Sequence, residues 1–127
     1  MELRRGDVYL ADLPELQNSN VQKGKRPVII ISNEMALKHS PVVQYIPLIT
    51  KLGKPKLPVH VDLTADFLDP SIALVEQIGC IDKKRLIKKK GTLSKLDMFK
   101  IDYALIKQCD INIDMLRNIK QKQYAIA

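Results

Sequence analysis

Lys25-Arg26-Pro27-Val28-Ile29-Ile30-Ile31-Ser32-Asn33 is the stretch that decides the fold of this chain. Its four consecutive β-branched residues are typical of a strand that is buried on both faces or nearly so, and we expect this strand over 27–32. Pro27 removes one donor from the backbone hydrogen-bond ladder, which suits the entrance of a strand. Arg26 therefore lies at the mouth of a rigid strand, where its permanent charge suits a site that handles phosphate.

Short apolar segments on both sides of this strand predict a mainly β fold. We expect further strands over 5–12, 42–49, 58–63, 71–78 and 87–93, loops over 15–25 and 51–56, and single helical turns over 34–40 and 83–86. Met98, Ile101, Leu105 and Cys109 recur at helical spacing and predict one long helix over 95–108. We expect an α+β domain: a small, strongly bent sheet or half-open barrel, closed by this C-terminal helix. One domain should span 1–127, in which 110–127 form an extension with a second helix over 112–121.

Composition and charge limit the classes of function. The net charge is +7, and it is uneven: residues 1–50 carry 6 basic and 5 acidic side chains, whereas residues 51–127 carry 15 and 9. This excess suits a polyanionic partner, either nucleic acid or an acidic protein segment, although it also serves solubility. Aromatic residues make up only 5% of the chain, which argues against a surface that binds single strands mainly by stacking bases.

Cysteine spacing and apolar runs predict a cytoplasmic protein without a metal site. Cys80 and Cys109 form no CxxC or zinc pattern, so we expect reduced thiols. No apolar run approaches the ~20 residues that span a bilayer, and the first residues lack the apolar core of a signal peptide. Asp62, Asp66 and Asp69 lie in a predicted turn without an EF-hand pattern, and we expect neither metal nor cofactor there.

Arg26 and Thr50 are candidates for the chemistry of RNA cleavage. Cleavage without metal uses the 2′-hydroxyl as nucleophile, and the enzyme must hold the extra negative charge on phosphorus. An arginine can hold that charge with its planar fork, and a threonine hydroxyl can donate to the same phosphate. Both residues end neighbouring predicted strands and can meet at one sheet edge. On sequence alone, a surface arginine and a strand-end threonine are the other interpretation.

Three further groups of polar residues leave alternatives open. His39 and His60 can form an acid–base pair, but a structural or surface role is the simpler interpretation for each. Gln77, at the end of the predicted strand over 71–78, either reads a base edge or only closes a backbone hydrogen bond. Six basic residues lie within 83–90, where they either attract phosphates or form a solvated face beside a turn.

The order and spacing of several short motifs resemble the MazF/PemK family of toxin endoribonucleases. The resemblance runs from about Arg4 to about Ile106. It rests on Arg4-Arg5-Gly6-Asp7-Val8-Tyr9, the stretch over 25–33, Pro47-Leu48-Ile49-Thr50, Leu57-Pro58-Val59-His60-Val61, Leu74-Val75-Glu76-Gln77-Ile78, Ile81-Asp82-Lys83-Lys84-Arg85-Leu86 and the helix from Asp97 to Leu105.

The resemblance implies a homodimer of SH3-like barrels that acts as a metal-independent endoribonuclease toxin. Family members cut single-stranded RNA at short sequences, leave a 2′,3′-cyclic phosphate and a 5′-hydroxyl, and are blocked by the acidic tail of a MazE-like antitoxin. By this matching, the catalytic arginine and threonine fall on Arg26 and Thr50. Asn33 and Gln77 fall on positions that line the RNA groove. The basic residues Lys25, Lys88, Lys89 and Lys90 are expected to bind RNA as well.

The chain also departs from the family pattern at two places. Val21 stands where the family's loop commonly carries an acidic residue, and Gly79-Cys80 stand where Arg-Thr is frequent. Both changes predict an altered sequence preference. There are two rival functions. One is a CcdB-like protein of the same fold that poisons DNA gyrase without nuclease activity, and the other, suggested by Val21 and Gly79, is an inactive relative that only binds RNA or antitoxin.

Overall fold

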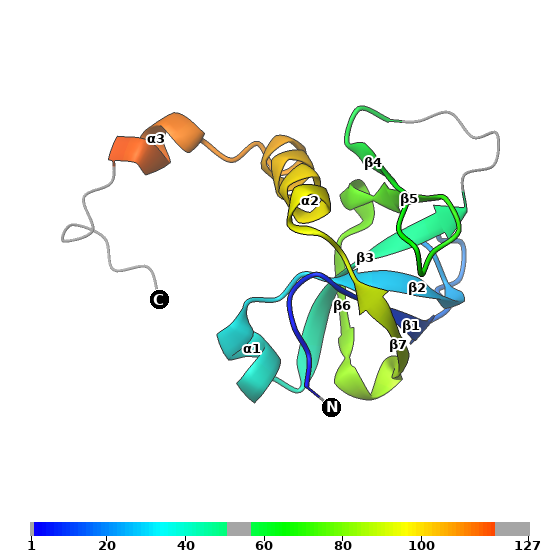
Figure 1. The fold of residues 1–127 in the computed structure, drawn as a ribbon. Coiled ribbons are helices and arrows are strands. Elements are labelled where there is room, and N and C mark those ends of the chain that lie inside the picture. Colours follow the sequence, from blue (N-terminus) through cyan, green and yellow to red (C-terminus); the bar gives the residue numbers. More distant parts are fainter. Residues whose placement is uncertain (1, 51–56, 119–127) are drawn as a thin grey trace.

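Seven antiparallel strands form one strongly bent sheet (Figure 1). The computed structural model describes residues 2–50 and 57–118, so the predicted loop over 51–56 lies outside the described residues. The strand order is β4-β5-β3-β2-β1-β7, and β6 pairs with β3. The strands are β1 (Asp7–Leu13), β2 (Gly24–Ile30), β3 (Val42–Thr50), β4 (His60–Leu63), β5 (Ser71–Leu74), β6 (Gly79–Asp82) and β7 (Leu86–Thr92).

β2 lies in the interior of the sheet, as its uninterrupted apolar run predicts. Val28, Ile29 and Ile30 are all fully buried. Alternation along the strand sends Val28 and Ile30 into one apolar cluster and Ile29 into another, on the opposite face of the sheet. A strand that packs on both faces needs no polar positions, which explains the continuous Val-Ile sequence.

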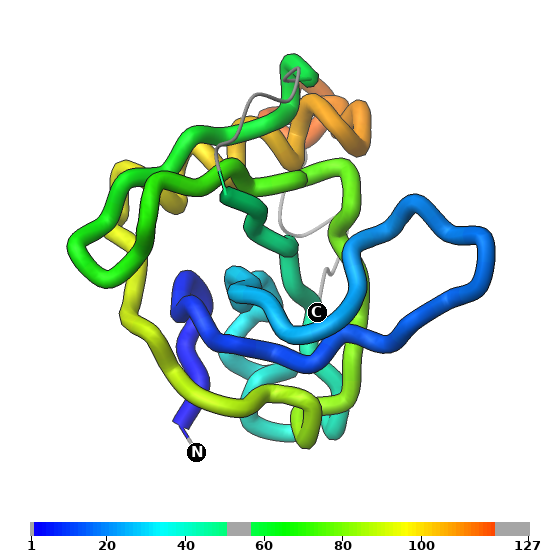
Figure 2. Tube along the Cα trace, turned by 90° about the vertical axis from the view of Figure 1, so that its right-hand side faces the viewer, coloured from blue at the N-terminus to red at the C-terminus, as the bar shows by residue number. Residues whose placement is uncertain are grey.

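The bend of the sheet comes from β3, which has different partners along its length. Its first half pairs with β6 and its second half with β5, while β2 pairs with its middle. Figure 2 shows the chain winding around the core as a barrel-like wall, with the connection between β1 and β2 projecting from it. This arrangement confirms the predicted half-open barrel.

Helix α2 (Lys95–Gln108) closes one side of the barrel, as predicted. Ser94 caps it by accepting a hydrogen bond from the backbone N–H of Asp97 at 3.1 Å. Ile101 and Ala104 are buried in the cluster that also contains Val8. The predicted turn before Pro41 is α1 (Glu34–His39).

The predicted second helix over 112–121 is present in its described part. Helix α3 (Ile113–Asn118) has no buried residue, and the last predicted positions of this helix, 119–121, lie outside the described residues. No helix in the described ranges is long and apolar enough to cross a membrane.

Near the end of the sheet one predicted boundary is wrong and one strand was not predicted. The strand expected over 71–78 stops at Leu74, and a 3₁₀ turn, η1 (Val75–Gln77), follows it. The chain then continues along β3 as β6, which was not predicted. The reason is tertiary: β5 and β6 pair antiparallel with opposite halves of β3 and so run in the same direction, and η1 interrupts the pairing between them. The predicted turn over 83–86 is η2 (Lys83–Arg85).

Candidate functional site

Arg26 and Thr50 meet at one pocket at the edge of the barrel. This Arg26 pocket has a volume of about 390 Å³ and is lined by Gln22, Arg26, Pro27, Leu48, Ile49, Thr50 and Ser71. Arg26 comes from the first half of β2 and Thr50 ends β3, so the pairing of these two strands brings them together. The predicted convergence of the two residues at a sheet edge is therefore present.

The guanidinium of Arg26 is oriented by the segment that leads into β2. Its Nε donates a hydrogen bond to the backbone carbonyl of Lys23 at 2.9 Å. Because a guanidinium has five N–H donors, this bond fixes the side chain and still leaves donors on the other two nitrogens. Such a group can hold an anionic phosphate in a defined orientation.

Gln77 lies on η1 and anchors the connection between β1 and β2. Its Oε1 accepts a hydrogen bond from the backbone N–H of Gln22 at 2.8 Å. Gln22 also lines the Arg26 pocket, so this bond fixes one wall of the pocket. The backbone-bonding alternative for Gln77 is thus present in the structure, and its amide nitrogen still has two N–H donors.

A second pocket adjoins the first. This Phe67 pocket has a volume of about 400 Å³ and is lined by Pro27, Thr50, Asp66, Phe67, Leu68, Asp69, Ser71 and Lys90. Pro27, Thr50 and Ser71 line both pockets. The two pockets therefore share a wall, and together we call them the groove; Arg26 lines one pocket and Lys90 lines the other.

The basic residues of β7 differ in what their side chains contact. Lys89 contacts the carboxylate of Asp7, with 3.4 Å between Nζ and Oδ1, and Asp7 is fully buried. Asp7 also accepts hydrogen bonds from the backbone N–H of Arg4 and the hydroxyl of Thr92. Lys89, although exposed like Lys88 and Lys90, thus neutralises a buried charge.

A bulge in β7 produces this difference. Opposite β1, the register passes from Gly91 to Lys89 and leaves Lys90 as the extra residue. This bulge directs Lys90 to the Phe67 pocket. Lys25 is exposed on β2 and pairs with Asp12 of β1.

Asn33 lies at the opposite end of β2 from Arg26. Its Oδ1 accepts a hydrogen bond from the backbone N–H of Ala36 at 2.9 Å and so caps α1. It lines a separate pocket beside α1, together with His39. The structure does not bring Asn33 to the Arg26 pocket.

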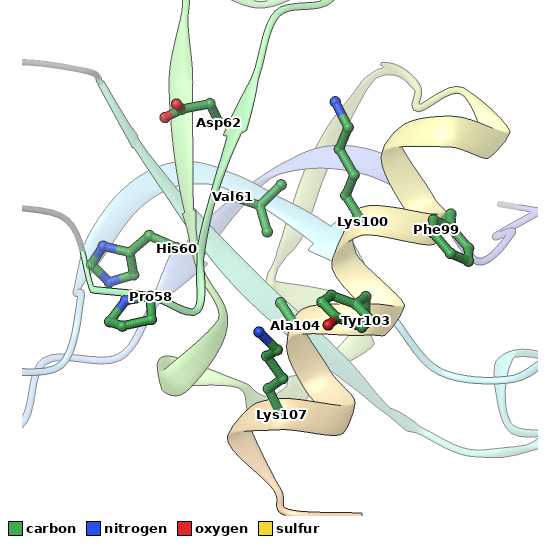
Figure 3. A pocket seen from close by; sticks show the side chains of 9 residues that line it. All are labelled: Pro58, His60, Val61, Asp62, Phe99, Lys100, Tyr103, Ala104 and Lys107. Atoms are coloured by element: carbon green, nitrogen blue, oxygen red, sulfur yellow. The ribbon is translucent and has the colours of Figure 1, made fainter. Parts of the chain in front are cut away.

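The two histidines are far from forming a pair. His39 is exposed on the last turn of α1, whereas His60 lies at the groove between β4 and α2 (Figure 3). In that groove Val61 points toward α2, and His60 points the other way, as strand alternation predicts.

Hydrogen bonds fix the tautomer of His60. Its Nδ1 accepts from the backbone N–H of Leu57 at 3.1 Å, so the proton of the neutral ring is on Nε2, which lies 3.0 Å from Oε2 of Glu76. The side chain of His60 is only 9% exposed. These contacts give His60 a structural role in joining β4 to η1.

Packing explains the glycine at position 79, where the chain departs from the family pattern. A Cβ at this position would lie 3.0 Å from the hydroxyl oxygen of Tyr45, so the tyrosine occupies the space of a side chain. Burial, followed by the charge of the nearby Cys80, raises the pKa of Tyr45 above its usual value of 10.0. The neutral phenol of Tyr45 thus covers the glycine on β6.

Three residues that line the two pockets beside Thr50 were not identified as site residues from the sequence: Asp66, Asp69 and Ser71. Ser71 pairs with Thr50 across β3 and β5, and only this register identifies it. Asp66 and Asp69 were considered only as metal ligands together with Asp62. In the structure Asp62 lines the β4–α2 groove, whereas Asp66 and Asp69 line the Phe67 pocket.

Comparisons with known proteins identify the family. The chain matches the family of PemK-like, MazF-like toxins of type II toxin–antitoxin systems over residues 4–109. It is 45% identical over 106 residues to Endoribonuclease MazF from Staphylococcus epidermidis, a match that covers 81% of this chain and 88% of that protein.

Solved structures show the same fold at low sequence identity. An endoribonuclease in complex with its cognate antitoxin, from Mycobacterial species, superposes with a TM-score of 0.70 at 23% identity, covering 87% of this chain and 96% of that one. MazF from Deinococcus radiodurans superposes with a TM-score of 0.71 at 17% identity, covering 84% and 94%. The family match and the identity to the Staphylococcus protein together show that this chain belongs to the PemK-like, MazF-like toxins of type II toxin–antitoxin systems.

Proposed function

We propose that this toxin-family endoribonuclease cleaves single-stranded RNA without a metal ion, with Arg26 and Thr50 at the cleaved phosphate. The observation that carries the proposal is the Arg26 pocket, which places both residues at one site at the edge of the barrel. The curated relative with 45% identity is named an endoribonuclease, which supports the same activity here.

The chemistry follows from these two side chains. The 2′-hydroxyl loses its proton and attacks the adjacent phosphorus, the bond to the 5′-oxygen breaks, and that oxygen takes up a proton. The products are a 2′,3′-cyclic phosphate and a 5′-hydroxyl. Arg26 stabilises the negative charge that develops on the phosphoryl oxygens, and the hydroxyl of Thr50 donates to the same group.

RNA approaches along the basic surface beside this site. Lys25, Lys88 and Lys90 are exposed and supply sequence-independent attraction to phosphates. Lys89 contributes less directly, because it is paired with Asp7. Gln77 contacts RNA through its amide nitrogen, since its oxygen is bonded to Gln22. A contact with Asn33 requires an RNA strand that extends along the length of β2.

The toxin acts in the cytoplasm as a homodimer and is neutralised by a MazE-like antitoxin. The net charge of +7 suits an acidic antitoxin tail that competes with RNA for the same surface. A similar structure is a complex of an endoribonuclease with its cognate antitoxin, which supports this partner class.

The test is cleavage of a mixed RNA pool by the purified protein in the presence of EDTA. Wild-type protein should produce fragments with 2′,3′-cyclic phosphate and 5′-hydroxyl ends, identified by end-specific ligation and sequencing. Arg26→Ala should reduce the rate by about 10²–10³-fold, the usual cost of one transition-state donor. Binding without cleavage by the wild type would instead identify an inactive relative, and gyrase poisoning without cleavage would identify a CcdB-like protein.

A further inference from the structure

The Phe67 pocket is a built feature of the fold, held from two sides. The ring of Phe67 occupies the space above Gly91, where an added Cβ would lie 2.5 Å from ring carbons. The hydroxyl of Ser71, a residue only 4% exposed, donates to the backbone carbonyl of Asp69 at 2.7 Å. Both contacts fix the connection between β4 and β5, so the pocket is formed before any ligand arrives.

Its position is next to the proposed cleavage site. Thr50 and Ser71, which pair across β3 and β5, line this pocket and the Arg26 pocket alike. A phosphate held between Arg26 and Thr50 would therefore have one of its neighbouring nucleotides at the Phe67 pocket.

The charges around the pocket select the part of the nucleotide that can enter. Asp66 and Asp69 are carboxylates and disfavour a phosphate, whereas Lys90 can hold a phosphate at the rim. The side chains of Pro27, Phe67 and Leu68 supply apolar surface that suits the flat face of an unstacked base.

Carboxylates at such a site read hydrogen-bond donors on the base edge. The exocyclic amino groups of cytosine, adenine and guanine can donate to a carboxylate. Uracil has no exocyclic amino group, and its ring N3–H lies between two carbonyl oxygens that repel a carboxylate.

We propose that the Phe67 pocket binds one nucleobase next to the cleaved phosphate, and that Asp66 and Asp69 select a base with an exocyclic amino group over uracil. This inference rests on the proposed endoribonuclease function. It also assigns a structural reason to Gly91, because a side chain at this position would displace the ring that forms the pocket wall.

The test compares cleavage-site preference in Asp66→Asn and Asp69→Asn with wild type on a randomised RNA pool, by sequencing the cut ends. The matched control is Asp82→Asn, which removes an exposed carboxylate of β6 outside both pockets. Wild type and the control should disfavour uracil at one position beside the cut. At least one pocket variant should accept uracil better there, by about 5- to 150-fold relative to wild type, the range for one base-edge contact.

A preference identical to that of wild type in both pocket variants, with normal thermal unfolding, overturns the inference and leaves the endoribonuclease function intact. The absence of any RNA cleavage by wild type overturns the proposed function instead. In that case, fluorescence anisotropy with short RNAs that differ at one base still tests the pocket. Equal wild-type affinity for all four bases at every position contradicts the inference.

Discussion

The amide oxygen of Gln77 accepts a hydrogen bond from the backbone N–H of Gln22 at 2.8 Å, so η1 fixes the connection between β1 and β2. These residues are 55 positions apart in sequence, and Gln22 lines the Arg26 pocket. The guanidinium of Arg26 is bonded to the same connection through the carbonyl of Lys23.

Gln77→Ala should loosen this connection and slow RNA cleavage. The lost hydrogen bond is worth about 1 kcal/mol, and its main effect should be local. Hydrogen exchange should accelerate at the amide of Gln22 and its neighbours, with little change in the helix α2. Gln77→Glu retains an acceptor oxygen and should keep the amide of Gln22 protected. Unchanged exchange in Gln77→Ala would show that the bond does not order the connection.

Substitutions at Thr50 and Arg26 should distinguish the groups that catalysis requires. Thr50→Ser keeps the hydroxyl and should cleave RNA at nearly the wild-type rate, whereas Thr50→Ala should lose most activity, about 10²-fold or more. Arg26→Lys should restore little, because an ammonium lacks the planar fork. Single-turnover cleavage measures the chemical step, and unfolding curves should confirm that each variant is folded. Wild-type cleavage by Thr50→Ala would contradict the assigned role.

The basic residues of β7 should divide into two kinds. Lys88→Ala combined with Lys90→Ala should weaken RNA binding for all sequences and flatten its salt dependence by about 0.7 log–log units per lost contact. Lys89→Ala should instead lower the free energy of unfolding by about 1 kcal/mol, a value reduced by the 44% exposure of this lysine. Binding titrations across a salt series and urea unfolding measure the two effects. Equal salt slopes in all variants would place this strand away from the RNA.

His60→Ala should destabilise the fold and leave the chemistry intact. Its ring joins the backbone N–H of Leu57 to the carboxylate of Glu76, so its loss should lower the free energy of unfolding by about 1–3 kcal/mol. His39→Ala is the matched control, because this residue is exposed, and it should change neither stability nor cleavage. A folded but inactive His60→Ala would favour the histidine mechanism over the Arg26–Thr50 mechanism.

The sequence by itself determined the elements whose signals are local. The Val-Ile run after Pro27 identified a strand buried on both faces, because such a strand has no solvent-facing positions to mark with polar residues. The helical spacing of Met98, Ile101, Leu105 and Cys109 identified α2. The order of the short motifs identified the family, and the strand-end positions of Arg26 and Thr50 allowed their meeting to be expected.

Only the tertiary structure decided which polar side chains share the site. Lys88, Lys89 and Lys90 are equivalent in sequence, but a bulge in β7 pairs Lys89 with buried Asp7 and directs Lys90 to the groove. Gln77 anchors Gln22, and Asn33 caps a helix at the far end of β2. Strand register and bulges arise from pairing between distant segments, so the face on which each side chain appears is set by contacts that local sequence does not encode.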